Sequence, residues 1–148
     1  MKLRFKSFLL ILLIAVAACT NESVPQQSQN DEGEVLSYFN DSITPKVVWQ
    51  YNNSDSTDIT ASHFYKNGKL QMKGQILNGV RNGKWTAWDD QGRMLSTGNY
   101  IDGIENGMWT VWFPDGVKRY EGMFKDGKRS GVWKFYDNQG MLLKEIEY

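Results

Sequence analysis

The sequence predicts an all-β fold, an elongated antiparallel array of stacked β-hairpins that repeats every 24 residues. From Tyr65 onward the chain divides without a gap into blocks 65–88, 89–112 and 113–136 and a half block, 137–148. Glycines and aromatic residues recur in columns at this period, a regularity typical of repeat proteins. A single hairpin cannot bury its apolar side alone, so stacked copies bury one another.

The columns contain most of the glycines and tryptophans of the chain. The glycine columns are Gly68, Gly92, Gly116 and Gly140; Gly74, Gly98 and Gly122; Gly79, Gly103 and Gly127; and Gly83, Gly107 and Gly131. The aromatic or apolar columns are Trp85, Trp109 and Trp133; Trp88, Trp112 and Tyr136; and Ile76, Tyr100, Phe124 and Tyr148.

Residues 1–18 have the pattern of a secretory signal segment. Basic side chains precede an apolar run, 8–18, that is too short to span a bilayer as a mature helix. The run ends in Val-Ala-Ala-Cys, 16–19, which resembles the lipobox of bacterial lipoproteins and implies a lipid on Cys19. Cys19 is the only cysteine, and lipidation explains a lone exported thiol better than an unpaired free cysteine does.

The resemblance to bacterial lipoproteins implies that several acyl chains are attached, and these would hold the protein firmly on a membrane. Because Thr20 rather than Asp follows Cys19, we expect the outer membrane rather than the inner one if the cell has both. Residues 19–34 are polar and rich in Gln and Ser, so they are predicted to form a disordered tether.

Residues 35–64 are predicted to form capping strands for the first edge of the array. Segments 47–51 and 59–65 have strand composition and flank a polar loop, and an unpaired edge otherwise invites pairing with another chain. Trp49 is expected to anchor this cap rather than to contact a ligand.

Each repeat block is expected to contain two antiparallel strands. Pro-Asp-Gly at 114–116 marks one turn, and a second, longer turn is expected where Asp126-Gly127 and Ser130-Gly131 bracket a polar segment. The expected strands are 69–77, 84–89, 93–101, 108–113, 117–125, 132–136 and 141–147.

Alternation along a strand places the two tryptophans of a block on opposite faces, as for Trp109 and Trp112. One ring column, with Trp85, Trp109 and Trp133, is expected to lie over the glycines at 74, 98 and 122, because a strand glycine marks a close approach of another group. The column Trp88, Trp112 and Tyr136 is then a candidate binding ladder on the other face. The alternative is that both columns are core, covered by sheet curvature or by the N-terminal segment.

The columns resemble the MORN repeat, specifically the bacterial variant found in proteins labelled as the YwqK-type antitoxin family. The resemblance rests on G-x-W-x-x-[WY], then [DN]-x-x-G or P-D-G, then G-x-[YF]-x-[DN]-G, over residues 65–148. It implies an elongated hairpin array used as a scaffold or binding surface, and it implies no catalytic residues.

The residues themselves offer little chemistry. The chain has 17 basic and 17 acidic side chains, so its charge favours neither nucleic acid nor anionic lipid as a partner of the fold. His63 is the only histidine and is expected to be structural. No nucleophile elbow, phosphate loop or metal-ligand spacing is present, so we expect no enzyme activity, metal or cofactor.

Two functions of different classes remain. The first is a lipid-anchored envelope protein whose repeat array presents a non-catalytic surface to a protein partner, with a glycan or lipid headgroup as the alternative ligand. The second is an antitoxin-like immunity protein that neutralises a toxin by binding it.

Overall fold

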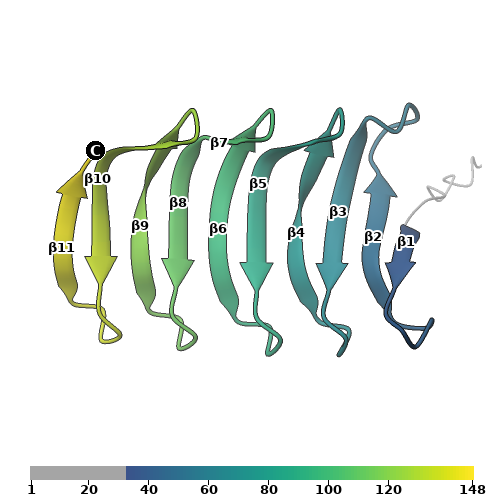
Figure 1. Cartoon of the computed structure of the whole chain (residues 1–148), viewed down its shortest axis with the longest axis horizontal. Helices are drawn as coiled ribbons and strands as arrows, with labels where there is room; N and C mark the ends of the chain where they lie inside the picture. The colour runs from purple at the N-terminus through teal and green to yellow at the C-terminus, as the bar shows by residue number, and fades with distance from the viewer. Residues whose placement is uncertain (1–32) are drawn as a thin grey trace, which may run out of the picture.

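The computed structural model describes residues 33–148 as one open antiparallel sheet of 11 strands, which confirms the all-β hairpin array. The signal segment, Cys19 and nearly all of the expected tether lie outside the described residues. Spatial order follows chain order, so the sheet grows by adding one hairpin after another (Figure 1). The strands are β1 (Glu34–Tyr38), β2 (Pro45–Tyr51), β3 (Asp58–Phe64), β4 (Leu70–Leu77), β5 (Val80–Trp88), β6 (Met94–Ile101), β7 (Ile104–Glu105), β8 (Gly107–Trp112), β9 (Lys118–Lys125), β10 (Lys128–Tyr136) and β11 (Leu142–Glu147).

Two kinds of turn alternate along the array. The turns that open each new block share two backbone bonds; in one of them Phe113 N donates to Val117 O and Gly116 N donates to Phe113 O. The same pair recurs at residues 65–69, 89–93 and 137–141. One sequence signal therefore gives one turn geometry four times.

The second turn is shorter than the sequence suggested. Asp126 and Gly127 both have positive φ, 50° and 76°, which is the two-residue hairpin turn that asparagine or aspartate followed by glycine favours. Strand β10 therefore begins at Lys128, and the expected turn glycine Gly131 lies inside it at a register shift, with φ 65°. The expected longer turn is wrong because this glycine forms a bulge within a strand rather than a loop.

Two strands have no counterpart among those expected. Strand β1 pairs with β2 and starts at Glu34, the last residue assigned to the tether. Strand β7 is a two-residue piece that pairs with β6 and is separated from β8 at Asn106. Both are too short for a periodic pattern to reveal.

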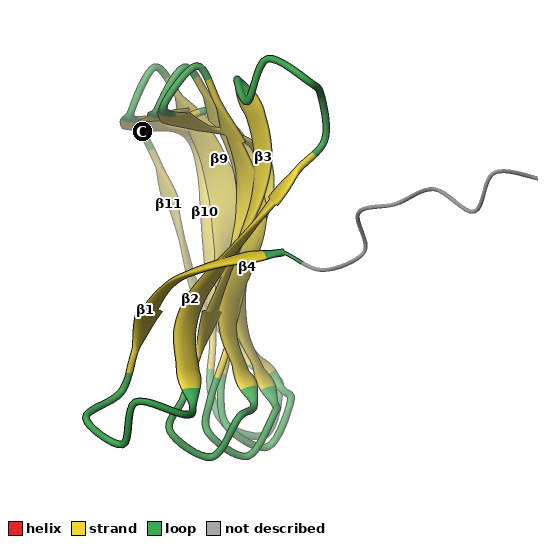
Figure 2. Cartoon of the chain, turned by 90° about the vertical axis from the view of Figure 1, so that its right-hand side faces the viewer, coloured by secondary structure: helices red, strands yellow, loops and turns green. Residues whose placement is uncertain are grey.

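The packed side of the sheet is formed by tryptophan rings lying on glycines. A Cβ added to Gly74, Gly98 or Gly122 would overlap the ring of Trp85, Trp109 or Trp133 respectively. We call the side that carries these three tryptophans the aromatic face. Trp85 is 4% exposed and Trp133 is fully buried, although the described part of the chain forms a single curved layer (Figure 2).

Aromatic rings continue this packing along the array. Edge-to-face contacts join Tyr100 to Trp109, Trp109 to Phe124 and Phe124 to Trp133, with centroids 5.6, 5.6 and 5.0 Å apart. Such pairs stabilise a fold beyond the area that they bury. The described sheet has no second layer, so its core consists of rings that pack on one another and on glycines along one face.

Candidate functional site

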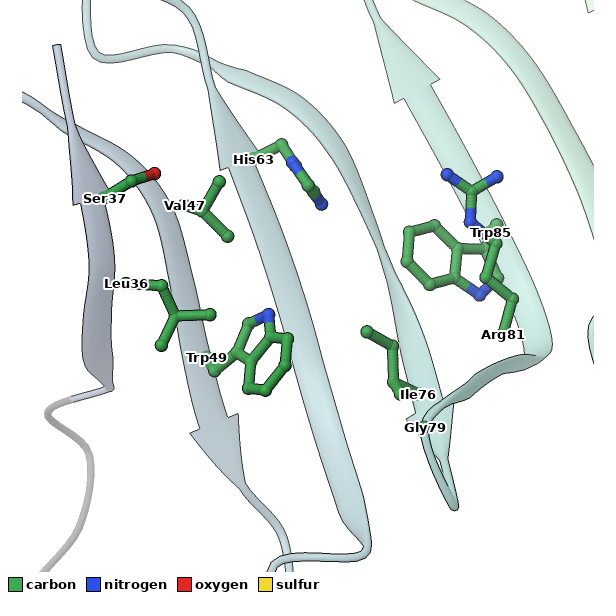
Figure 3. A pocket seen from close by; sticks show the side chains of 9 residues that line it. All are labelled: Leu36, Ser37, Val47, Trp49, His63, Ile76, Gly79, Arg81 and Trp85. Carbon is green, nitrogen blue, oxygen red and sulfur yellow. The ribbon is translucent and has the colours of Figure 1, made fainter.

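Three hollows along the array adjoin one another through shared lining residues. The first, about 390 Å³, lies between β1 and β5 and is lined by Leu36, Ser37, Val47, Trp49, His63, Ile76, Gly79, Arg81 and Trp85 (Figure 3). The second, about 150 Å³, shares Arg81 and Trp85 with the first and adds Met72, Thr86, Ala87, Ser96, Tyr100 and Trp109. The third, about 500 Å³, shares Ser96 and Trp109 with the second and adds Leu95, Val111, Trp112, Phe113, Pro114, Arg119 and Tyr120. We call these three hollows together the aromatic groove.

Arg81 is held in place by rings. Its guanidinium carbon lies 4.4 Å from the centroid of the Trp85 ring and 5.5 Å from that of Tyr100. Its Nη1 donates to the Tyr100 hydroxyl at 3.3 Å, and its Nη2 approaches the Met72 sulfur at 3.7 Å. None of the ion pairs formed within residues 33–148 includes Arg81, so its charge is not neutralised by a described carboxylate.

His63 shares the first hollow with Arg81 (Figure 3). Partial burial lowers the pKa of His63 below its usual 6.5, and the positive charge of Arg81 lowers it further. The imidazole is therefore neutral at pH 7 and can accept or donate one hydrogen bond. The expectation that His63 is structural placed it correctly on a strand but did not place it in a groove.

Trp109 departs from the pattern of its column. The indole N–H of Trp85 donates to Gln75 O at 2.9 Å, and that of Trp133 donates to Met123 O at 3.0 Å. Within residues 33–148 the indole N–H of Trp109 makes no such bond to Asn99 O, the carbonyl at the corresponding position.

The ring of Trp109 is also placed differently. Its Cε3 and Cζ3 atoms are the ones closest to Gly98, whereas Cδ2 and Cε2 of Trp85 and Trp133 lie nearest their glycines. Gly107, just before it, has φ 101°, against 62° and 65° for Gly83 and Gly131. Within the described part of the chain the Trp109 N–H has no acceptor. No fully buried side-chain polar atom there lacks a partner, so this N–H is not completely buried.

The candidate ladder consists of three half-buried rings that make no ring contact with one another within residues 33–148. Trp112 lines the third hollow of the aromatic groove. The carbonyl of Trp88 accepts the Tyr65 hydroxyl at 2.9 Å, and Tyr136 donates its own hydroxyl to Glu121 at 2.9 Å. The three residues therefore lie in separate surroundings, and only Trp112 belongs to the groove.

The sequence did not single out the charged residues of the groove. Arg81 and Arg129 share one repeat position, and Glu105 occupies it in the block between them. Arg129 repeats the placement of Arg81, since it lies 4.6 Å from the Trp133 ring and bonds the Tyr148 hydroxyl at 2.6 Å. This duplication at 48 residues was a usable signal.

The groove is lined by groups that can bind a ligand. It presents aromatic rings, hydroxyl groups, an unpaired indole N–H and the guanidinium groups of Arg81 and Arg119, and its lining contains no carboxylate. Residues 33–148 contain no group of His, Cys, Asp and Glu side chains placed to hold a metal ion. They also contain no helix of the length and apolarity that crossing a bilayer requires.

Comparison with known proteins identifies the repeats. Residues 58–78, 105–126 and 129–148 match the family model described as MORN repeat variant. The first matched segment begins seven residues before Tyr65, so it includes β3, which the sequence had assigned to the cap. No curated protein matches the chain.

Among solved structures, the chain resembles part of the pneumococcal O-GlcNAc transferase GtfA, determined in complex with UDP and GlcNAc. The likeness covers 69% of this chain and 19% of that chain, at 16% identity and a TM-score of 0.41. This chain thus spans about a fifth of that structure, and a likeness this weak carries no argument about function.

Proposed function

We propose that this chain, three segments of which match the MORN repeat variant, is a lipid-anchored protein of the bacterial envelope. Its repeat array acts as a non-catalytic binding or scaffold surface. The observation that carries the binding role is the aromatic groove, which runs across neighbouring hairpins and has two arginines but no carboxylate in its lining. The anchor is supported by the signal pattern of residues 1–18 and by the lone Cys19.

The anchor is tested by substituting Cys19→Ser in the full chain and separating the cell envelope from the soluble fraction. We expect the native protein to partition with membranes and to incorporate a labelled fatty acid. The variant should carry no labelled fatty acid and should no longer be recovered as a lipidated protein in the membrane fraction. A native protein that carries no lipid, or a variant that remains equally lipidated, contradicts the anchor. Density separation of inner and outer membranes tests the preference for the outer one.

A second candidate is an antitoxin-like immunity protein, which is suggested by the resemblance to the YwqK-type variant. In this role the array would neutralise a toxin by covering it, and a lipid anchor would suit a toxin that arrives from outside. Expression of the gene beside this one provides the test. Toxicity that this chain relieves by forming a complex supports the role, and a neighbour that is harmless alone counts against it.

A further inference from the structure

We propose that the aromatic groove binds a linear acidic polysaccharide, with carboxylates of its uronic acid units held by Arg81 and Arg119. This inference rests on the proposed binding role of the array and names the ligand. Four features of the groove support it: its length, its charge, its exposed rings and the donors between them.

The length of the groove favours a linear polymer. Its lining runs from β1 and β2 to β9, and neighbouring hollows share residues, Arg81 and Trp85 at one junction and Ser96 and Trp109 at the next. The six strand spacings from β2 to β9 correspond to roughly 30 Å. A compact ligand would fill one hollow, whereas an extended chain can lie along all three.

The charge of the groove favours an anion. Arg81 and Arg119 line it, no aspartate or glutamate does, and His63 is neutral at pH 7 because its pKa is lowered. Arg81 is already oriented by the Trp85 ring and the Tyr100 hydroxyl, so little side-chain freedom remains to be lost on binding. A guanidinium fixed in this way, with no described carboxylate to neutralise it, is suited to a planar carboxylate.

Arg119 supplies the second cation at the far end. Its guanidinium carbon lies 5.6 Å from the centroid of the Phe113 ring, and it forms none of the ion pairs within residues 33–148. Three strand spacings separate β5, which carries Arg81, from β9, which carries Arg119, or roughly 14 Å across the sheet. The pairing register also places Arg119 level with Ala87, toward the end of β5 opposite to Arg81. Both cations are therefore reached together only by a ligand with anionic groups spaced along a chain.

The rings and donors between the cations favour a sugar chain. Trp49, Trp109, Trp112 and Tyr120 are each half-buried in the lining, so part of each ring is open to a ligand. The C–H faces of sugar rings pack on such surfaces, while their hydroxyls take part in hydrogen bonds. Trp109 lines both the second and the third hollow, and its unpaired N–H can donate to a hydroxyl.

Other polymers fit less well. An extended peptide usually binds a sheet at an open edge, but the strands below the groove, from β2 to β9, are paired on both sides. A single-stranded nucleic acid carries a phosphate at every nucleotide and stacks its bases on ring faces. This groove offers two arginines, and its central rings meet at 80° and 78°, so they form no parallel set.

The test is a titration of the full chain in neutral detergent, followed by tryptophan fluorescence and calorimetry. The probes are a long oligogalacturonate, digalacturonate, the methyl-esterified form of the long oligomer, and a single-stranded oligothymidylate. The variants are Arg81→Gln, Arg119→Gln and Trp109→Phe. Lys84→Gln is the matched control, because Lys84 is an exposed cation on the same strand as Arg81 and lines none of the three hollows.

We expect saturable binding of the long oligogalacturonate, weaker binding of the dimer that cannot join both cations, and little binding of the neutral ester. Each arginine substitution should weaken the affinity about tenfold, because a charge-assisted hydrogen bond is lost. Trp109→Phe should weaken it severalfold, and Lys84→Gln should leave it unchanged. Arg119 is exposed, so its variant tests the groove even if Arg81→Gln disturbs the Trp85 packing.

Several results would overturn the inference. They are the absence of saturable oligogalacturonate binding, equal affinity for acid and ester, tighter binding of the oligothymidylate, or an effect of Lys84→Gln as large as that of Arg119→Gln. The fractionation of the Cys19→Ser variant tests the proposed anchor independently of this inference. A lipidated chain that does not bind the uronate oligomer overturns this inference alone.

Discussion

The ring of Trp133 lies against the backbone of Gly122, so closely that a methyl group on this glycine would overlap the indole. Gly122 has no positive φ, so its backbone alone would accept a side chain. The glycine is required by the neighbouring ring and not by a turn. The same relationship joins Gly74 to Trp85 and Gly98 to Trp109.

Gly122→Ala should therefore destabilise the fold by about 1–3 kcal/mol, the usual cost of overpacking. Gly68→Ala is the comparison, because a Cβ there meets nothing within 4 Å and the only strain is its φ of 78°. That strain costs about 1 kcal/mol. Urea unfolding followed by circular dichroism measures both, and equal costs would contradict the ring-on-glycine explanation.

Trp133→Phe should cost more stability than Trp109→Phe. Trp133 is fully buried and its N–H donates to Met123 O at 3.0 Å, whereas Trp109 is half-buried and its N–H has no acceptor within residues 33–148. The lost hydrogen bond alone predicts a difference of about 1 kcal/mol in the free energy of unfolding. Identical unfolding curves for the two variants would show that the two rings are equivalent.

His63 should titrate below pH 6.5 in the folded protein, because burial and Arg81 both lower its pKa. The folded state then binds fewer protons than the unfolded state below pH 6.5, so stability falls as pH drops through this range and levels off below the folded pKa. Since His63 is the only histidine, one NMR resonance reports the titration. Arg81→Gln should raise this pKa, and an unchanged value would mean that Arg81 exerts no charge effect there.

Strand β11 should be kept from self-association by its charges. Among the described residues β11 pairs only with β10, so its other edge is open. Leu142 and Leu143 are 51% and 64% exposed and directly precede the charged residues Lys144 and Glu145. Replacing Lys144 and Glu145 together by valine should raise concentration-dependent light scattering severalfold, because charge on an edge strand opposes pairing with another chain. Lys84→Val on the doubly paired β5 is the control, and equal scattering from both variants would point to general hydrophobicity.

The sequence by itself determined the hairpin array. The 24-residue columns specify the strands, the turn that opens each block and the partner of each buried ring, because a repeat packs mainly against its nearest neighbours in the chain. The short edge strand β1 and the bulge at Gly131 were not foreseen, since a few residues carry no period and a glycine between polar residues suits a loop equally well.

Tertiary structure alone decided the groove. Trp49 and Arg81 come from different parts of the sequence and meet in one hollow only because sheet order brings their strands together (Figure 3). The columns treat Trp85, Trp109 and Trp133 as equal, yet the Trp109 ring lies differently on its glycine, with Cε3 and Cζ3 nearest rather than Cδ2 and Cε2. Periodicity records which residues repeat, whereas the placement of each ring depends on the neighbours that it meets once the strands are in place.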